Sequence, residues 1–249
     1  MAASPLNSSC LCIFAHPDDE VFRCGGTLAL LANSGVQVWI LCLTSGQAGS
    51  CGTPPICTPE ELGEVRKQEL RCSCKTLGLE KPIILDFSDG ELEYTSQAEM
   101  ENLIQEYVER IHSQIIITWP LDGLSGHPDH RTVSARTTQV FTRMMPVEKE
   151  YLKSLYYLAV PQSIAAALGM NSLSALPDET ISVEMDVRTV LDRKMAAIDC
   201  HRTQLGGSPI LKRDREAREL FLGKEHFMSA QSDGSGDVLI DLCQSMGEK

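Results

Sequence analysis

An apolar run that ends in a cluster of charged side chains constrains this chain more than any other feature of its sequence. Residues 10–15 read Cys-Leu-Cys-Ile-Phe-Ala, and His-Pro-Asp-Asp-Glu follows at residues 16–20. A short, continuous apolar run is typical of a buried strand in a parallel sheet. Open α/β sheets bind ligands beyond the carboxyl ends of such strands. The cluster is therefore the first candidate site.

A second cluster of the same kind follows another apolar run. Residues 115–119 read Ile-Ile-Ile-Thr-Trp, and Gly-His-Pro-Asp-His comes later at residues 126–130. Histidine and carboxylate side chains are usual ligands of catalytic zinc, which keeps three protein ligands and one open position. Two such clusters after expected strands indicate a metal site.

Three residues of the two clusters can supply the ligands. His16 and Asp19 are three residues apart on a tight turn and can face a common centre. His130, at the start of a helix that Pro128 opens, can complete the set. Asp18 stands between the first two ligands and must point elsewhere. A carboxylate that lies near the metal without binding it suits a general base for the attacking water.

Two further residues of the second cluster suit proton transfer. His127 lies in the loop before the helix, where it can approach the substrate side of the metal. We expect Asp129 to hold the second ring nitrogen of His127. An imidazolium oriented by a carboxylate stabilises the oxyanion of a tetrahedral intermediate and protonates a leaving amine.

These residue types also have plainer interpretations. A histidine beside a proline in a loop is commonly capped or solvated, and an acidic residue at a helix start commonly serves the helix dipole, the role we expect for Glu20. However, three of the six histidines fall within two short clusters, both just after expected strands. This concentration favours the metal site.

The net charge limits the partners of the chain. The formal charge is −12, which opposes binding to nucleic acid or to an anionic bilayer because polyphosphates require a positive surface. The sequence contains no run of about 18 apolar residues, so no membrane span is expected, and no charged leader precedes an apolar stretch. We expect a cytoplasmic protein with a small-molecule partner.

The cysteines are expected to be mostly reduced core residues. Cys12, Cys24 and Cys42 lie in apolar segments, as buried thiols of a cytoplasmic protein do. The Cys-x-Cys pairs lack the Cys-x-x-Cys spacing of structural zinc sites. Cys51 and Cys57 bracket a loop and are the pair that we expect to oxidise more readily.

The order of apolar and amphipathic segments predicts a single α/β domain over residues 1–249. Its mainly parallel sheet is expected to be covered by helices on both faces. Residues 229–236 are flexible in composition, and 238–242 are expected to form an edge strand or a tail. Strands are expected at 10–15, 36–43, 83–85, 114–118, 155–160 and 181–185, and helices at 25–34, 58–77, 97–112, from 128 onward and 187–202.

The two clusters resemble the signature motifs of the PIG-L/LmbE-like family of zinc-dependent N-acetylglucosamine de-N-acetylases. The matching segments are Ala-His-Pro-Asp-Asp-Glu at 15–20 with Gly-Gly-Thr at 25–27, and Gly-His-Pro-Asp-His at 126–130. The resemblance extends from about residue 10 to residue 205. It includes Arg66 with Glu69, Asp89, and residues 194–204, which are similar to a late family helix that ends His-x-Ser-Gln.

This resemblance implies a three-layer, Rossmann-like fold of the LmbE type and a role for each matching residue. His16, Asp19 and His130 would bind Zn²⁺, although such ligands also accept Fe²⁺ or Co²⁺. Asp18 would be the base, and His127, oriented by Asp129, the electrophilic and acid partner. Arg66 and Asp89 would contact sugar hydroxyls, whereas composition alone also allows Arg66 to be a solvated charge and Asp89 a turn residue before Gly90.

The implied activity is hydrolysis of the acetamide of an N-acetylglucosamine-type sugar. Some relatives place a tyrosine where this chain has Ser125, and membrane-anchored relatives carry an apolar amino-terminal helix that this sequence lacks, so a soluble amino sugar is the expected substrate. The particular sugar and the oligomeric state, with a homo-oligomer possible, stay open. A two-metal phosphoesterase and a non-catalytic metal- or nucleotide-binding module are the alternatives, although no Gly-x-Gly-x-x-Gly follows the first strand.

Overall fold

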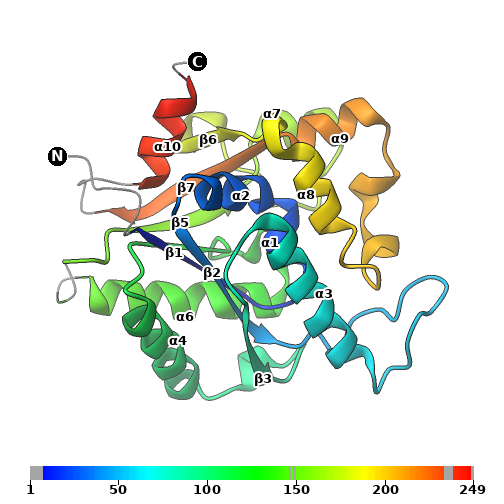
Figure 1. Cartoon of the computed structure of the whole chain (residues 1–249), viewed down its shortest axis with the longest axis horizontal. Helices are drawn as coiled ribbons and strands as arrows, with labels where there is room; N and C mark the ends of the chain where they lie inside the picture. Colours follow the sequence, from blue (N-terminus) through cyan, green and yellow to red (C-terminus); the bar gives the residue numbers. More distant parts are fainter. Residues whose placement is uncertain (1–7, 146, 148–149, 233–237, 248–249) are drawn as a thin grey trace.

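A seven-stranded sheet forms the centre of the protein (Figure 1). The computed structural model describes residues 8–145, 147, 150–232 and 238–247. The strand order is β3-β2-β1-β4-β5-β7-β6, in which the first five strands are parallel and β7 runs antiparallel to both of its neighbours. The strands are β1 (Ser9–Phe14), β2 (Gln37–Thr44), β3 (Ile83–Phe87), β4 (Ile115–Thr118), β5 (Ser154–Ala159), β6 (Val183–Asp186) and β7 (Lys224–Ser232).

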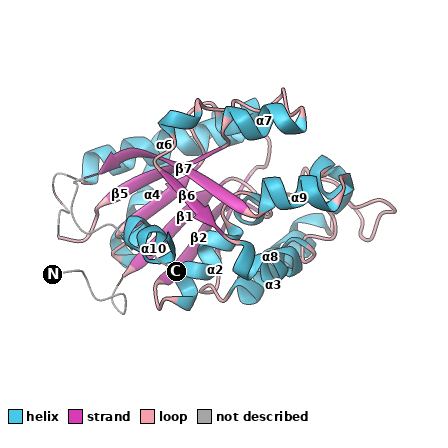
Figure 2. Ribbon diagram, turned by 90° about the horizontal axis from the view of Figure 1, so that it is seen from above, coloured by secondary structure: helices cyan, strands magenta, loops and turns pink. Residues whose placement is uncertain are grey.

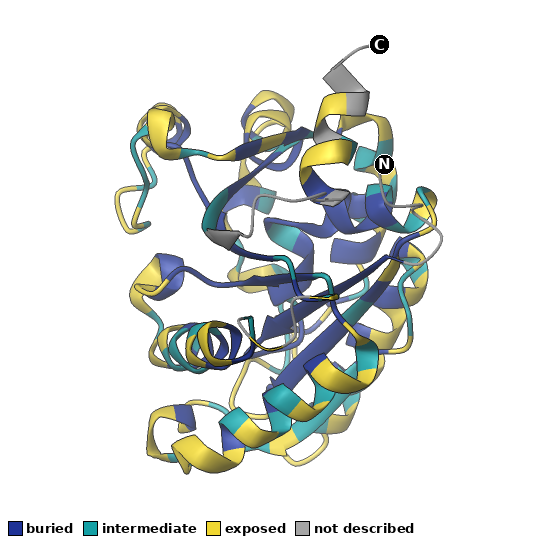
Figure 3. Ribbon diagram, turned by 90° about the vertical axis from the view of Figure 1, so that its left-hand side faces the viewer, coloured by how far each residue is buried: buried dark blue, intermediate teal, exposed yellow. Residues whose placement is uncertain are grey.

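The central strand β1 explains why the apolar runs are continuous. All six of its residues are buried, because both faces of the sheet are covered. Cys12 and Phe14 pack into the core on one face, and Leu11 and Ile13 pack into the core on the other. Figure 3 shows the buried strands between helices whose outer surfaces are exposed.

Helices form a layer on each face of the sheet (Figure 2). On one face, α2 (Gly25–Asn33), α3 (Leu62–Leu77) and α8 (Leu191–Ile198) pack around Phe14. On the other, α4 (Gln97–Ile111) and α6 (Pro128–Met144) pack around Ile13. This arrangement confirms the predicted three-layer α/β fold. The remaining helices are α1 (Asp19–Phe22), α5 (Gly123–Gly126), α7 (Gln162–Leu168), α9 (Arg215–Leu222) and α10 (Val238–Gly247).

Two predicted helices begin later than the sequence pattern indicated. Helix α3 begins at Leu62, and the Thr58 amide donates to the Glu61 carboxylate in the turn before it. A short 3₁₀ turn precedes α8, so that the predicted helix over 187–202 is regular only from residue 191 to residue 198.

Among the described residues, no helix is both long and apolar enough to cross a bilayer.

The carboxyl-terminal part differs from the prediction. Residues 229–232, expected to be flexible, belong to β7, whereas 233–237 lie outside the described residues. Strand β7 escaped prediction because it carries buried polar side chains, including Glu225 and His226. The segment from residue 238, expected to be an edge strand or a tail, forms helix α10 instead. Its Leu239 is buried against the core, which a helix of this composition can achieve with one apolar face.

The cysteines follow the prediction only in part. Cys12, Cys24 and Cys42 are buried free thiols, as predicted. The expected oxidisable pair is wrong, because Cys51 and Cys57 are free thiols, whereas a disulfide joins Cys72 of α3 to Cys200. These two cysteines are 128 residues apart in the sequence. Spacing along the chain therefore could not reveal the pair.

Candidate active site

The two motif clusters meet at the carboxyl edge of the sheet. Strands β1 and β4 are adjacent and parallel, with Cys10 opposite Ile115. The segments that follow these strands therefore leave the same edge side by side, which is the usual position of ligand sites in open α/β sheets. The structure brings all three predicted ligands, His16, Asp19 and His130, into one group.

His16 is held by two carboxylates. Its Nε2 lies 2.9 Å from an oxygen of Asp89 and 3.0 Å from an oxygen of Asp129. Burial opposes a charge on the ring, but the hydrogen bonds to Asp129 and Asp89 raise the pKa of His16 to about 10. Because Nε2 donates to these carboxylates, Nδ1 is the ring nitrogen that faces Asp19, at 3.8 Å.

Asp19 is fixed through one of its two oxygens. Oδ2 accepts hydrogen bonds from the amides of Ala15 and His16, at 3.1 and 3.0 Å, and from Nε1 of Trp119, at 3.2 Å. Oδ1 lies 3.4 Å from Nε2 of His130. Although burial opposes ionisation, His130 and His16 hold the pKa of Asp19 well below its usual range.

His130 is oriented from two sides. Its ring stacks on Trp119 with 4.1 Å between centroids and 5° between planes. Its Nδ1 lies 3.3 Å from the carbonyl oxygen of Gly123, which leaves Nε2 turned toward Asp19. Trp119 in turn is fixed by Ser134, whose hydroxyl donates to the Trp119 carbonyl at 2.6 Å.

This geometry fits a metal ion. Each of the three predicted ligands keeps one donor atom directed at the shared centre, and the three donor atoms lie within 4.8 Å of one another. The opposite atom of each ligand is hydrogen-bonded to a carboxylate, a carbonyl or an N–H group. Metal-binding histidines and carboxylates are usually oriented by such outer contacts. Two imidazoles and one carboxylate are also a common ligand set for catalytic metals.

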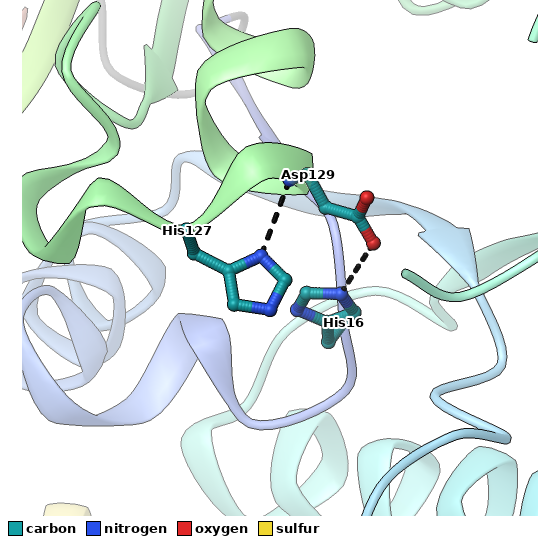
Figure 4. Close-up of side chains that lie close together, drawn as sticks. All are labelled: His16, His127 and Asp129. Carbon is teal, nitrogen blue, oxygen red and sulfur yellow. Dashed lines mark hydrogen bonds and ion pairs between the residues drawn. The ribbon is translucent and has the colours of Figure 1, made fainter. Parts of the chain in front are cut away.

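The prediction that the Asp129 carboxylate orients His127 is wrong, because this carboxylate contacts His16 instead. The Asp129 carboxylate accepts from Nε2 of His16 and from the amides of Gly90 and Leu92, at 2.7 and 3.1 Å. As Figure 4 shows, His127 is contacted instead by the backbone N–H of Asp129, which donates to Nδ1 at 3.2 Å. Asp129 is the second residue of α6, and its side chain turns back to His16 rather than toward the preceding residues.

His127 is therefore best described as a neutral imidazole. Burial, together with the neighbouring His130 and His16, lowers the pKa of His127. Because Nδ1 accepts from a backbone amide, the ring proton resides on Nε2. His127 thus presents an N–H donor rather than the expected carboxylate-bound imidazolium.

Asp18 lies beside the metal ligands with its side chain toward Arg66. One guanidinium nitrogen of Arg66 lies 3.2 Å from Oδ1 of Asp18. Burial raises the pKa of Asp18 to about 6, and Arg66 opposes this shift. A carboxylate with a pKa near neutrality can accept a proton and release it at physiological pH.

The predicted sugar contacts are engaged with the protein. Arg66 is buried and also donates to the carbonyls of Pro17 and Gly46. Gly46 has a φ of 69°, and a Cβ there would collide with the guanidinium, so this close approach requires glycine. Asp89 accepts from His16 and, at 2.9 Å, from the amide of Ala48. Both residues lie beside the predicted metal ligands, and their hydrogen-bonding groups are directed to other residues of the protein.

Two side chains at the site have contacts that the sequence did not predict. Trp119, noted only as the end of an apolar run, contacts Asp19 and stacks on His130. Glu20 lies in the first turn of α1, as predicted, but its buried carboxylate bonds to Ser73 and His201, at 2.6 and 2.7 Å. The signal for His201 was its place in the late His-x-Ser-Gln-like segment.

A cavity of about 510 Å³ lies next to the site. Trp119, Leu124 and Ser125, which belong to the segment between β4 and His127, form part of its wall, and so does Phe22 of α1. Ligand pockets commonly enclose about 300–1,000 Å³ and are mostly apolar. Ser125, where some relatives carry tyrosine, thus faces this cavity. The other wall residues include Leu168, Met170, Ser172, Leu173, Ile210, Arg213 and Phe221.

Comparison with known proteins gives a family and a close functional class. Residues 11–141 match the family model described as PIG-L, GlcNAc-PI de-N-acetylase. The chain is similar to a probable N-acetyl-alpha-D-glucosaminyl L-malate deacetylase 2 of Bacillus cereus. The two are 31% identical over 196 residues, which cover 78% of this chain and 82% of the relative.

Two solved structures share the fold at lower identity. The N,N'-diacetylchitobiose deacetylase from Pyrococcus horikoshii gives a TM-score of 0.66 at 21% identity, covering 92% of this chain and 86% of its own. GalB, the 4-carboxy-2-hydroxymuconate hydratase from Pseudomonas putida KT2440, gives a TM-score of 0.67 at 19% identity, and the match covers 93% of this chain and 99% of GalB. One is a deacetylase and the other a hydratase, so the likeness of fold does not fix the reaction.

Proposed function

The chain belongs to the PIG-L family of GlcNAc-PI de-N-acetylases, and we propose that it is a zinc-dependent hydrolase that removes the N-acetyl group from an N-acetylglucosamine-type sugar or conjugate. The products are acetate and a free amine. The convergence of His16, Asp19 and His130, with Asp18 beside them, carries this proposal. The relative from Bacillus cereus supports the acetamide of a glucosaminyl group as the bond that is cut.

Zinc bound to these three ligands would activate a water molecule and polarise the carbonyl of the acetamide. Asp18 accepts the proton of the attacking water, a role that fits a carboxylate with a pKa of about 6 held by Arg66. His127 donates its Nε2 hydrogen to the oxygen that becomes negative as the carbonyl is attacked. The proton held on Asp18 can then pass to the departing amine.

The substrate is proposed to lie across the site between Asp89 and the cavity. Asp89 and Arg66 keep their proposed place beside the sugar, and the exposed part of the Asp18 side chain, 23%, marks where the base is open to the substrate. The cavity beside Trp119 would hold the part of the conjugate beyond the sugar. Its size permits a substrate larger than N-acetylglucosamine alone.

The alternative reactions have less support. A phosphoesterase with two metals needs two independent ligand sets. Among the described residues, the two groups that could hold a metal are His16 with Asp19 and His130, and His16 with His127 and Asp129, so they share His16 and are not independent. A nucleotide-binding module would need a glycine-rich, phosphate-binding turn after β1. In this chain the turn after β1 carries the proposed metal ligands His16 and Asp19 instead. A hydratase, which the fold also permits, would release no acetate.

The experiment follows acetate and metal together. Purified protein is offered N-acetylglucosamine and a panel of its conjugates, and metal is measured by mass spectrometry on the same sample. We expect acetate release with about one zinc per chain, and a loss of turnover of at least about a hundredfold in Asp18→Ala with the metal retained. A protein that binds zinc but releases acetate from no conjugate would contradict the assignment of the bond. A protein without metal or activity would favour the non-catalytic alternative.

We also propose that the chain is a single domain and that it acts in the cytoplasm. The chain acts as one domain, because β6 and β7 from its last third extend the same sheet as β1. It acts in the cytoplasm, for which the buried free thiols are the support. The Cys72–Cys200 disulfide opposes this assignment, so recovery of these two cysteines as free thiols from intact cells would support the cytoplasm, and recovery as an oxidised pair would argue for an oxidising compartment. Light scattering with size-exclusion chromatography would decide whether it forms a homo-oligomer.

A further inference from the structure

The carboxylate of Glu20 lies directly behind the proposed base. Glu20 is 1% exposed. Its Oε2 accepts from the backbone N–H of Asp18 at 3.0 Å, and its Oε1 accepts from the Ser73 hydroxyl and from Nε2 of His201, at 2.6 and 2.7 Å. These contacts are made to one backbone amide and to two side chains that are not predicted metal ligands. Glu20 therefore contacts neither a reacting atom nor the proposed metal.

Asp18 has a backbone conformation that must be held in place. Its φ is 104°, in the left-handed region that residues with side chains rarely adopt. Such conformations persist where surrounding contacts determine them, and they are concentrated at functional sites. This conformation separates two consecutive carboxylates, so that Asp18 meets Arg66 while Asp19 meets His130. The hydrogen bond from Glu20 is made to the N–H of this same residue.

Glu20 is itself anchored by two distant segments. Ser73 belongs to α3, and His201 follows α8, with only 1% of its surface exposed. Two residues further on, Thr203 donates its backbone N–H and its hydroxyl to Glu69 of α3, at 2.8 and 2.6 Å. The segment that carries His201 is thus fastened to α3 and cannot withdraw without breaking buried hydrogen bonds.

We propose that Glu20, fixed by His201 and Ser73, is a positioning residue that holds Asp18 in the orientation required of the base. This inference rests on the proposed role of Asp18. It replaces the helix-dipole interpretation of Glu20, because the described contacts of the carboxylate are specific bonds to Asp18 and to two remote side chains. A residue with a purely structural role would stabilise the fold without affecting the orientation of Asp18.

The test uses graded variants of Glu20. Glu20→Met preserves the length of the side chain and removes both carboxylate oxygens, leaving only a weakly accepting sulfur, and Glu20→Gln retains one oxygen that can accept from the Asp18 N–H. Glu225→Gln is the matched control. Glu225 is also fully buried, accepts from the backbone amides of Gly26 and Thr27, and lies outside the site. It pairs with Lys194 at 2.7 Å, as Glu20 pairs with His201, so Glu225→Gln also removes a buried charge from its partner.

We expect kcat for acetate release to fall about a hundredfold in Glu20→Met and about tenfold in Glu20→Gln, since small misplacements of a catalytic group have effects of this size. KM and zinc content should stay within about twofold of wild type. Glu225→Gln should keep its kcat. If Glu20→Met does not fold, the result for Glu20→Gln decides the question. A wild-type kcat in Glu20→Gln would overturn the proposal. A loss of kcat in Glu225→Gln as large as that in Glu20→Gln would overturn it as well.

Two readouts separate positioning from general destabilisation. In an Asp18→Ala background, Glu20→Gln should cause no further loss of the residual turnover, because the residue on which it acts is gone. An equal loss in both backgrounds would refute the proposal. A crystal structure of Glu20→Met should show Asp18 at a negative φ, and an unchanged φ near 104° would also refute it. The φ measurement does not depend on activity, so it stands even if no conjugate proves to be a substrate.

Discussion

Nε2 of His16 lies 3.0 Å from Oδ2 of Asp129, so the aspartate of the second cluster serves the histidine of the first. Together with Asp89, this contact fixes the ring so that Nδ1 faces Asp19. It also keeps His16 protonated in the metal-free protein, with a pKa of about 10. The two motifs are therefore coupled through the outer contacts of one ligand.

Metal affinity should rise with pH because the metal must displace a proton from His16. Below about pH 10 the ring is charged, and binding at Nδ1 releases one proton. The affinity for zinc should therefore increase by up to about tenfold for each pH unit between pH 7 and 8.5. Competition against a chelator of known pH dependence measures this slope. An affinity that does not change over this range would contradict a charged His16.

The metal-free protein should lose stability as the pH rises. A folded-state pKa raised from 6.5 to about 10 gives a contribution that is fully present below pH 6.5 and disappears as the pH rises through 10. The denaturant concentration at the unfolding midpoint of the metal-free protein should therefore decrease as the pH is raised from 7 to 10. Zinc-loaded protein is the control, since its His16 is neutral throughout, and an equal fall in both forms would exclude His16 as the cause.

Removing the charge of Asp129 should weaken metal binding. In Asp129→Asn the His16 ring loses an anionic partner, and such changes in outer contacts typically cost about 10- to 100-fold in metal affinity. The dependence of zinc affinity on pH should become shallower, because the pKa of His16 falls toward its ordinary value. Asp214→Asn is the matched control, since Asp214 caps α9 at a helix start outside the site. Equal zinc affinity in both variants would argue against the His16 contact.

Local sequence patterns predicted the strands other than β7 and the meeting of the three predicted metal ligands, but not all of the contacts around them. Continuous apolar runs sufficed for β1 and β4, since both strands are buried on both faces. Their parallel pairing then accounts for the meeting of His16 with His130. Strand β7 was not found, because its buried Glu225 is balanced by Lys194 at 2.7 Å, a partner 31 residues earlier that no local pattern reveals.

The partner of a polar side chain depends on tertiary packing. Asp129 is adjacent in sequence to the His127 cluster, yet the side chain turns toward His16 and the turn at Gly90. Arg66 resembles a sugar-binding residue, but folding places it against Asp18. In each case the structure places the residue beside the predicted metal ligands, whereas its contact partner could be found only from the fold.

Narrowing the cavity beside Trp119 should discriminate against large conjugates. Ser172 is exposed at the cavity wall, so Ser172→Trp can fill the space without disturbing the core. We expect KM for a conjugate with a bulky group beyond the sugar to rise about tenfold or more, while N-acetylglucosamine itself is affected within about twofold. Ser172→Ala leaves the cavity open and is the control. Equal effects on small and large substrates would place the bulky group elsewhere.

Replacing Arg66 should move the pH dependence of catalysis. The guanidinium opposes the rise of the Asp18 pKa that burial causes, so its loss in Arg66→Met should raise that pKa above about 6. The base works only when deprotonated, and kcat/KM falls about tenfold per unit below its pKa. The acid limb of the pH profile should therefore shift to higher pH in the variant. If Arg66 served only to bind sugar hydroxyls, KM would rise at every pH and the acid limb would stay in place. Arg66→Lys retains a positive charge and should leave the limb nearer to its wild-type position, which makes the limb, rather than the overall rate, the measurement that assigns the residue.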